Sequence, residues 1–269
     1  MASNPGSRTL RAALGACAVG VGALLATPSA RAADDEPAAT PYRPSVAGGA
    51  SLSRPGWLEV EFGAQRLGGR DTERRDSLPY LLKLALDERW AVLLGGEARV
   101  RLAPEGASTV SGVGDTVATL KYRAPFGGDS EAYGVEASVK LPTARDALGS
   151  GQRDYGIKGI YSADLRSGFH LDANLGVTRL GGVEAGQGRA LTAWAAAVSH
   201  PVGDAWTLAL DLSGTTQRGA PSTSQLLGAA SYSVSKRVVV DVGAAVGLTS
   251  ATPRWTAFSG VTVLLGQLF

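Results

Sequence analysis

From residue 57 to the end of the chain, apolar and polar side chains alternate with a period of two. In the first such stretch, Leu58, Val60 and Phe62 alternate with Glu59 and Glu61. This alternation puts apolar side chains on one face of a β-sheet and polar side chains on the other. The pattern predicts an all-β fold of about twelve strands, at 57–67, 77–87, 90–102, 115–123, 132–142, 153–165, 169–180, 190–200, 206–216, 225–234, 238–248 and 255–269.

The lengths of these segments and of their connections indicate a membrane-spanning barrel. Most segments have nine to thirteen residues, and a tilted strand needs about 9–11 residues to cross a bilayer. Short and longer connections alternate along the chain, as in outer-membrane barrels with short periplasmic turns and longer outer loops. The short set is 88–89, 124–131, 166–168, 201–205 and 235–237, and the longer set is 68–76, 103–114, 143–152, 181–189, 217–224 and 249–254. An even strand number places both termini on the periplasmic side.

Aromatic residues fall at the ends of the predicted strands rather than at their centres. Two aromatic girdles around an apolar band are typical of barrels in lipid. The predicted periplasmic girdle contains Trp57, Trp90, Tyr122, Tyr133, Phe169, Trp206, Tyr232 and Phe269, and the outer one contains Tyr80, Tyr155, Trp194, Trp255 and Phe258. Of the aromatic residues, Phe62 alone is predicted clearly at mid-span.

We therefore predict a single antiparallel up-and-down transmembrane β-barrel over residues 56–269, with its apolar face toward lipid and its polar face toward the lumen. Barrels of about eight strands are filled by side chains, and those of sixteen or more enclose a wide pore. A twelve-strand barrel lies between them, so we expect a narrow or plugged lumen. The predicted lumen-lining residues carry both signs of charge, which argues against strong ion selectivity: Glu59, Glu61, Lys83, Glu97, Arg99, Arg101, Lys121, Arg123, Glu136, Lys140, Lys158, Asp172, Asp211 and Asp241.

The first 32 residues have the pattern of a secretory signal peptide. Arg8 and Arg11 precede an apolar run over residues 12–27, and small residues flank Arg31 at the expected cleavage position before Ala33. The run is shorter than the roughly 20 residues of a spanning helix. Residues 33–55 are rich in Ala, Pro, Ser and Gly, which predicts a disordered periplasmic leader.

Composition argues against several other classes of protein. The chain has 26 basic and 24 acidic residues, and the charges ahead of Ala33 are all arginines, so 23 basic and 24 acidic residues remain after cleavage. This balance argues against a nucleic-acid partner, which requires a concentrated basic face. The sole cysteine, Cys17, lies in the predicted signal peptide, and His170 and His200 are the two histidines. We therefore expect no cofactor, no metal site and no catalytic residues.

Two stretches resemble a known family. One runs from Gly112-Val113-Gly114-Asp115 to Leu120-Lys121-Tyr122-Arg123, and the other from Glu136 through Pro142-Thr143 and Gly149-Ser150-Gly151 to Asp154-Tyr155. Both resemble the outer-membrane proteins described as "putative MetA-pathway of phenol degradation", and the resemblance covers about residues 112–165. It implies an outer-membrane channel of a Gram-negative bacterium that takes up small compounds, often aromatic or apolar.

The chain also ends on an amphipathic strand with a terminal Phe269. This ending resembles the sorting signal that the barrel-assembly machinery reads. The expected partners are therefore outer-membrane lipid, that machinery and a small-molecule solute.

Three functions follow as hypotheses. The first is a channel in which small solutes, apolar or aromatic ones included, diffuse through a narrow lumen. The second is a structural or surface-binding outer-membrane barrel with a closed lumen. The third, a barrel enzyme, is disfavoured because no predicted strand pairs a serine with a histidine at its outer end.

Overall fold

The computed structural model describes residues 36–69, 74–104, 106, 108–124, 130–145 and 148–269. These residues form thirteen strands and one short 3-10 turn, η1 (Arg166–Gly168). The strands are β1 (Trp57–Gly68), β2 (Arg74–Ala85), β3 (Trp90–Ala103), β4 (Val110–Gly112), β5 (Thr116–Arg123), β6 (Glu131–Leu141), β7 (Asp154–Asp164), β8 (His170–Arg179), β9 (Ala190–Val202), β10 (Trp206–Gln217), β11 (Ala220–Ser235), β12 (Val238–Gly247) and β13 (Trp255–Gln267).

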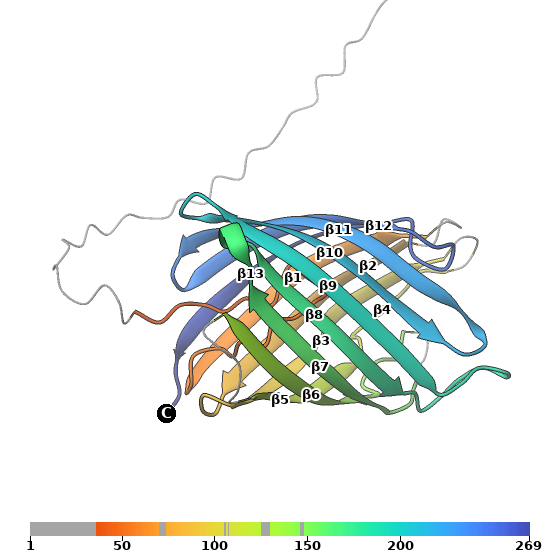
Figure 1. Cartoon of the computed structure of the whole chain (residues 1–269). Helices are drawn as coiled ribbons and strands as arrows, with labels where there is room; N and C mark the ends of the chain where they lie inside the picture. The colour runs from red at the N-terminus through yellow and green to blue at the C-terminus, as the bar shows by residue number, and fades with distance from the viewer. Residues whose placement is uncertain (1–35, 70–73, 105, 107, 125–129, 146–147) are drawn as a thin grey trace, which may run out of the picture. The chain divides into compact units, whose positions relative to one another are not determined.

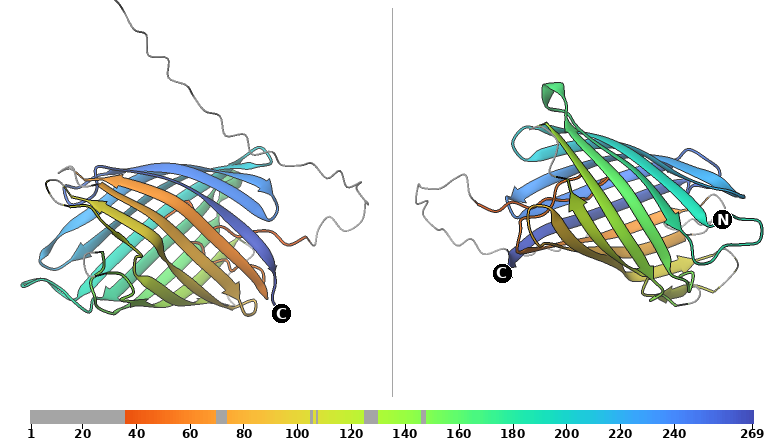
Figure 2. Two further views of the ribbon diagram at one scale, coloured as in Figure 1. Left: turned by 180° about the vertical axis from the view of Figure 1, so that it is seen from behind. Right: turned by 60° about the horizontal axis from the view of Figure 1, so that its bottom comes forward.

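Twelve of these strands close a barrel. Apart from the short β4, each strand pairs antiparallel with its neighbours in the chain, and β1 pairs with β13 to close the sheet. Figures 1 and 2 show the strands slanting around this cylinder, with the C-terminus at one end. The additional strand β4 pairs with Val100–Leu102 near the end of β3, inside a predicted loop. The predicted twelve-strand up-and-down barrel is therefore confirmed, with β4 as an addition to it.

The two faces of the wall differ as the alternation predicts. On β10, Leu210 and Leu212 are 62% and 40% exposed, whereas Asp211 between them is completely buried. On β12, Val242 is 58% exposed and Asp241 is 7% exposed. The exposed apolar side chains form the surface that meets hydrocarbon, since a closed sheet satisfies its own backbone hydrogen bonds there. Among the described residues, no helix is long and apolar enough to span a membrane.

Aromatic rings gather on the wall at the end that carries the C-terminus, here called the periplasmic end. They stack between neighbouring strands, with ring centroids 4.5–5.2 Å apart in the pairs Trp90–Tyr122, Tyr133–Tyr161, Phe169–His200 and Trp206–Tyr232. These pairs confirm the predicted periplasmic girdle at Trp90, Tyr122, Tyr133, Phe169, Trp206 and Tyr232. In the outer girdle, Phe258 departs from the prediction: it lies on the lumen face, beneath the guanidinium of Arg43.

One predicted outer loop is replaced by a tight hairpin. The sequence predicts a loop over residues 217–224, but β10 and β11 pair as far as Gln217 and Ala220. Two residues, Arg218 and Gly219, make the turn, and Gly219 has φ +76°, a conformation that favours glycine. Residues 217–224 are mostly polar and show little alternation of polar and apolar side chains. The sequence therefore does not distinguish these strand ends from a polar loop.

A β-bulge in β3 reverses the faces of its outer half. The register between β2 and β3 shifts by one residue, from Pro79 opposite Glu97 to Leu78 opposite Arg99, so Ala98 is the extra residue. An extra residue in a strand of period two exchanges the inner and outer faces beyond it. Val100 consequently points inward and is completely buried.

Candidate functional site: the barrel lumen

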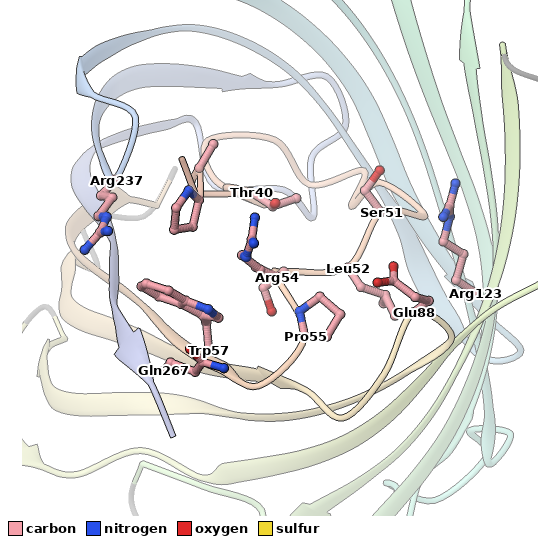
Figure 3. Close-up of a pocket in the computed structure, with 13 residues that line it drawn as sticks. Thr40, Ser51, Leu52, Arg54, Pro55, Trp57, Glu88, Arg123, Arg237 and Gln267 are labelled. Carbon is pink, nitrogen blue, oxygen red and sulfur yellow. The ribbon is translucent and has the colours of Figure 1, made fainter. Parts of the chain in front are cut away.

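Residues 36–55 form an internal segment that occupies the lumen at its periplasmic end. The segment enters beside the β11–β12 turn, where the Ala39 amide donates to the Lys236 carbonyl at 2.8 Å. It returns to the wall at Pro55, which bridges to Ala85 just before β1. Figure 3 looks into this end and shows the segment inside the ring of strands. The predicted disordered leader is therefore wrong for residues 36–55, because inward-facing polar side chains bind this segment along its length.

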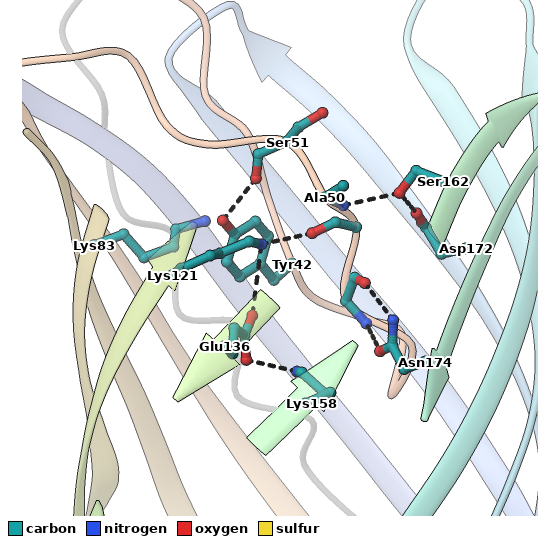
Figure 4. A network of polar contacts seen from close by, with 12 residues as sticks. Tyr42, Ala50, Ser51, Lys83, Lys121, Glu136, Lys158, Ser162, Asp172 and Asn174 are labelled. Atoms are coloured by element: carbon teal, nitrogen blue, oxygen red, sulfur yellow. Dashed lines mark hydrogen bonds and ion pairs between the residues drawn. The ribbon is translucent and has the colours of Figure 1, made fainter. Parts of the chain in front are cut away.

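Tyr42 anchors the segment on one side of the lumen. Its ring lies between the ammonium groups of Lys83 and Lys121, which are 4.0 and 3.9 Å from the ring centroid. Its hydroxyl donates to the Ser51 carbonyl at 2.8 Å (Figure 4). Its backbone amide donates to Glu61 at 2.7 Å. Burial, together with nearby carboxylates, raises the pKa of the Tyr42 hydroxyl well above its ordinary value. The hydroxyl therefore stays protonated and remains a donor.

Lys83 contacts two buried carboxylates on β1 and also the backbone of the internal segment. Its ammonium lies 2.5 Å from both Glu59 and Glu61, and all three side chains are at most 3% exposed. The ammonium also donates to the Thr40 carbonyl at 2.6 Å, and the Thr40 amide donates to Glu59 at 2.9 Å. Buried charges are stable only when paired and hydrogen-bonded. The backbone of the internal segment supplies hydrogen bonds that water would otherwise provide.

Arg43 holds the segment to β12. Its guanidinium makes two hydrogen bonds to Asp241, at 3.0 and 3.1 Å, a geometry stronger than a single contact. Gly63 and Gly260 leave room for this side chain, since a Cβ atom at either position would collide with the guanidinium. The two glycines are thus required by the close approach of Arg43 to the wall.

Asp211 binds the tip of the segment, residues 45–47, through three hydrogen bonds. One carboxylate oxygen, Oδ2, accepts from the Ser45 hydroxyl at 2.8 Å, the Val46 amide at 2.9 Å and the Ala47 amide at 2.8 Å. Ala47 packs against Ala195 and Ala197 of β9 in a small apolar cluster. The tip is therefore fixed by one charged group and by a contact between small side chains.

Beyond the tip, the segment crosses to the opposite wall. Both backbone groups of Gly48 bond to the Asn174 amide, at 2.8 and 2.9 Å, and the Ala50 amide donates to Ser162 at 2.8 Å. Lys121 donates to the Gly49 carbonyl at 2.5 Å. Figure 4 shows these contacts as separate groups along the backbone of the segment. The segment is thus bound to inward-facing residues of seven strands: β1, β2, β5, β7, β8, β10 and β12.

Four cavities lie around this segment, and the smallest, of about 220 Å³, lies beside Tyr42, Arg43 and Ser45 next to β1 and β2. A vestibule of about 510 Å³ extends from Val46 toward the outer loops, and a periplasmic cavity of about 730 Å³ lies beneath Thr40 and Leu52 (Figure 3). A smaller side cavity of about 280 Å³ runs between the segment and the inner faces of β8 to β11. Val46 lines the vestibule, and Ser45 and Ala47 line the side cavity. The tip therefore separates the outer cavity from the inner ones.

The fourteen sequence-predicted lumen residues divide into three groups. Ten contact the internal segment directly or line a cavity beside it: Glu59, Glu61, Lys83, Lys121, Arg123, Glu136, Lys158, Asp172, Asp211 and Asp241. Two lie elsewhere on the inner face: Glu97 pairs with Arg75, and Lys140 pairs with Asp115 and Asp154. The prediction is wrong for Arg99 and Arg101, because the Ala98 bulge turns both outward.

Sequence reasoning missed the residues that occupy the lumen, namely Tyr42, Arg43 and the tip. It also missed Ser162 and Asn174, whose uncharged side chains bind the segment. One signal was present: Tyr42 and Arg43, flanked by Pro41 and Pro44, interrupt a stretch of small residues. An aromatic and a cation held between two prolines are unusual in a disordered leader.

Comparisons with known proteins identify the fold. The COG4313 outer membrane channel from Pseudomonas putida F1 superimposes with a TM-score of 0.64 at 13% identity, over 80% of this chain and 98% of that one. The NanC porin superimposes with a TM-score of 0.55 at 9% identity, over 77% of this chain and 100% of that one. The KdgM porin superimposes with a TM-score of 0.54 at 10% identity, over 77% of this chain and 99% of that one. No curated protein sequence matches the chain. The protein therefore has the β-barrel fold of these outer-membrane channels and porins.

The family assignment rests on sequence. The family described as "Putative MetA-pathway of phenol degradation" matches residues 42–265. This match begins at Tyr42, so it includes most of the internal segment as well as the barrel. The chain belongs to this family.

Proposed function

We propose that the protein is an outer-membrane channel for small uncharged solutes, aromatic ones included, and that residues 36–55 form its internal gate. The observation that carries this proposal is the arrangement of the cavities. The vestibule lies on one side of the tip, and the side and periplasmic cavities lie on the other. A displacement of residues 45–47 would open the vestibule to the side cavity, and Thr40 and Ser51, which line both the side and the periplasmic cavities, would mark the rest of the route.

The lining of the vestibule indicates the class of solute. Its polar groups are mainly hydroxyls, from Thr119, Ser138, Thr178, Ser213, Thr215, Thr223, Ser224 and Thr252. The charged groups Glu136 and Lys158 neutralise each other at 2.7 Å. A volume of about 510 Å³ lies within the range of small-ligand sites, roughly 300–1,000 Å³. Hydroxyls and small apolar side chains together suit a small ring that carries a hydroxyl group, in agreement with the family's description.

The route past the gate is lined by small side chains. Ala197, Ser199, Thr207, Ala209 and Ser231 face the side cavity. The tip is therefore the element that must move, and its attachment to Asp211 controls the passage.

A structural barrel with a permanently closed lumen is the second candidate, since the same contacts could hold the segment in place at all times. An enzyme fits less well. His170 has Asp164 2.6 Å from Nδ1 and Asp172 3.3 Å from Nε2. A histidine with a carboxylate at each ring nitrogen donates from both, which leaves no free nitrogen to act as a general base.

Two measurements on the reconstituted barrel test the proposal. Liposome swelling compares arabinose with the larger raffinose, and we expect arabinose alone to enter. Single-channel current through the open barrel is then recorded with phenol or cyclohexanol added, and we expect phenol to block more strongly. A barrel that passes neither ions nor arabinose, even with the tip released by Asp211→Ala, would be a closed structural barrel.

Two further roles belong to the same proposal. Residues 1–32 would direct export, with cleavage before Ala33, and Phe269 would be recognised by the barrel-assembly machinery. Phe269 lies 64% exposed just beyond β13, where a partner could reach it. Deletion of Phe269 should slow the appearance of the heat-modifiable folded band in cells, whereas deletion of an outer-loop residue should not.

A further inference from the structure

The outer wall of the barrel carries a groove that joins cationic and apolar side chains. Its volume is about 680 Å³, and its lining includes Arg66, Arg99 and Arg101 together with Leu78, Val242 and Ala257. Arg66 pairs with Ala257 and with Asp76, and Asp76 pairs in turn with Arg101. One row close to the outer strand ends thus crosses β13, β1, β2 and β3 and contains Ala257, Arg66, Asp76 and Arg101. Leu78 and Arg99 pair with each other beside this row, and Val242 on β12 lies nearer to mid-span.

The groove has a local cause in the sequence. Pairing between β1 and β2 is interrupted between Phe62–Tyr80 and Gln65–Ser77. Pro79 lies in this gap and has no amide hydrogen to donate. On the other side of β2, the Ala98 bulge turns Arg99 and Arg101 outward. Ala64 and Ser259, which are small, line the depression that results.

The charge of the groove is unbalanced. Arg66 lies 2.5 Å and Arg74 lies 3.3 Å from the Asp76 carboxylate. Arg99 and Arg101 are exposed on the same face. Among the described residues on the outer face in and beside the groove, the guanidinium groups of Arg66, Arg74, Arg99 and Arg101 therefore accompany a single carboxylate, that of Asp76. Charged side chains on the lipid face are costly unless they reach water or an anionic headgroup.

We propose that this groove binds a phosphorylated glycolipid of the outer leaflet, of the lipid A class. Its phosphate would lie on Arg99 and Arg101, because guanidinium groups bind phosphate through paired hydrogen bonds. Its acyl chains would lie along Leu78, Val242 and Ala257. The arginines lie near the outer strand ends, and the apolar side chains lie toward mid-span. This order matches that of the headgroup and the acyl chains in such a lipid. This inference rests on the outer-membrane location and is independent of solute transport.

The test is native mass spectrometry of the full barrel in detergent, titrated with purified lipid A. The probes are diphosphorylated lipid A, its dephosphorylated form and phosphatidylglycerol. The variants are Arg99→Ala/Arg101→Ala and a matched control, Arg179→Ala, which removes an exposed arginine from the end of β8 on another part of the wall. Heat-modifiable migration on a gel verifies that each barrel is folded.

We expect diphosphorylated lipid A to bind the wild type and Arg179→Ala equally. The double variant should bind roughly tenfold more weakly, as expected when charge-assisted contacts to phosphate are lost, and the dephosphorylated lipid should bind all three barrels weakly. Equal binding to the double variant and the wild type would overturn the proposal. Equal binding of phosphatidylglycerol and lipid A would overturn it as well, because any anionic lipid would then suffice. If the double variant fails to fold, Arg99→Lys/Arg101→Lys provides the test, with weakened binding expected because lysine lacks the paired donors.

Discussion

Asp211 is the residue whose removal should most directly release the internal gate. Its carboxylate is completely buried, and its Oδ2 atom accepts all three hydrogen bonds that hold the tip. A hydrogen bond to a charged group contributes about 1.5–3 kcal/mol. In Asp211→Ala, part of the stabilisation lost with these hydrogen bonds is offset, because the free-energy cost of burying a carboxylate is removed as well. We estimate a net loss of about 2–4 kcal/mol for the closed state, since these contributions are not additive.

That loss predicts a large change in channel opening. At about 1.4 kcal/mol for each factor of ten, the ratio of open to closed states should rise at least roughly 30-fold in Asp211→Ala. Asp211→Asn keeps one oxygen acceptor without its charge and should have an intermediate effect. The assay is single-channel recording in a planar bilayer, with open probability as the readout.

The matched control is Asp204→Ala, which removes an aspartate from the exposed β9–β10 turn. It should leave the open probability unchanged. Equal open probabilities in wild type and Asp211→Ala, both folded by heat-modifiable migration, would refute the reasoning, because the three bonds would then not hold the gate shut.

Three further predictions concern the wall and the other anchor. Leu210→Arg puts a charge on the lipid face, where it should destabilise the barrel by about 2–4 kcal/mol, measured by urea unfolding in liposomes; no change there would contradict the face assignment. Lys83→Met leaves Glu59 and Glu61 without their buried cation and should cost about 3–5 kcal/mol in the same assay, and a neutral result would mean that water already solvates them. Tyr42→Leu should raise ion leakage more than Tyr42→Phe, since phenylalanine keeps the ring between the two lysines, and equal leakage would contradict that role.

The wall of the barrel could be predicted from the sequence because one physical requirement dominates it. Each spanning strand must meet lipid on one face, so Leu210 and Val242 alternate with Asp211 and Asp241. A closed sheet then follows from the need to pair every backbone group in hydrocarbon. A closed barrel with apolar residues at alternate positions satisfies both the contact with lipid and the pairing of the backbone, so the alternation in the sequence predicts the wall.

Features that depend on contacts between distant segments could not be predicted in the same way. Residues 36–55 are low in large apolar side chains, and their order comes from partners on other strands, such as Asp211 and Asn174. The bulge at Ala98 depends on the pairing of β3 with the proline-containing β2. Alternation alone assigns Arg99 and Arg101 to the lumen, because the extra residue is recognised only from the register of the partner strand.

A reversible cross-link between the tip and the wall tests most directly the claim that residues 36–55 are a movable gate. Ala47 packs against Ala197, so Ala47→Cys/Ala197→Cys, made in a Cys17→Ala background, should form a disulfide on oxidation. Single-channel current through one barrel is recorded before and after a reductant is added. Our account predicts no openings while the tip is cross-linked and the return of openings on reduction. The same current in both states would contradict it, because solutes and ions would then pass without any movement of the tip.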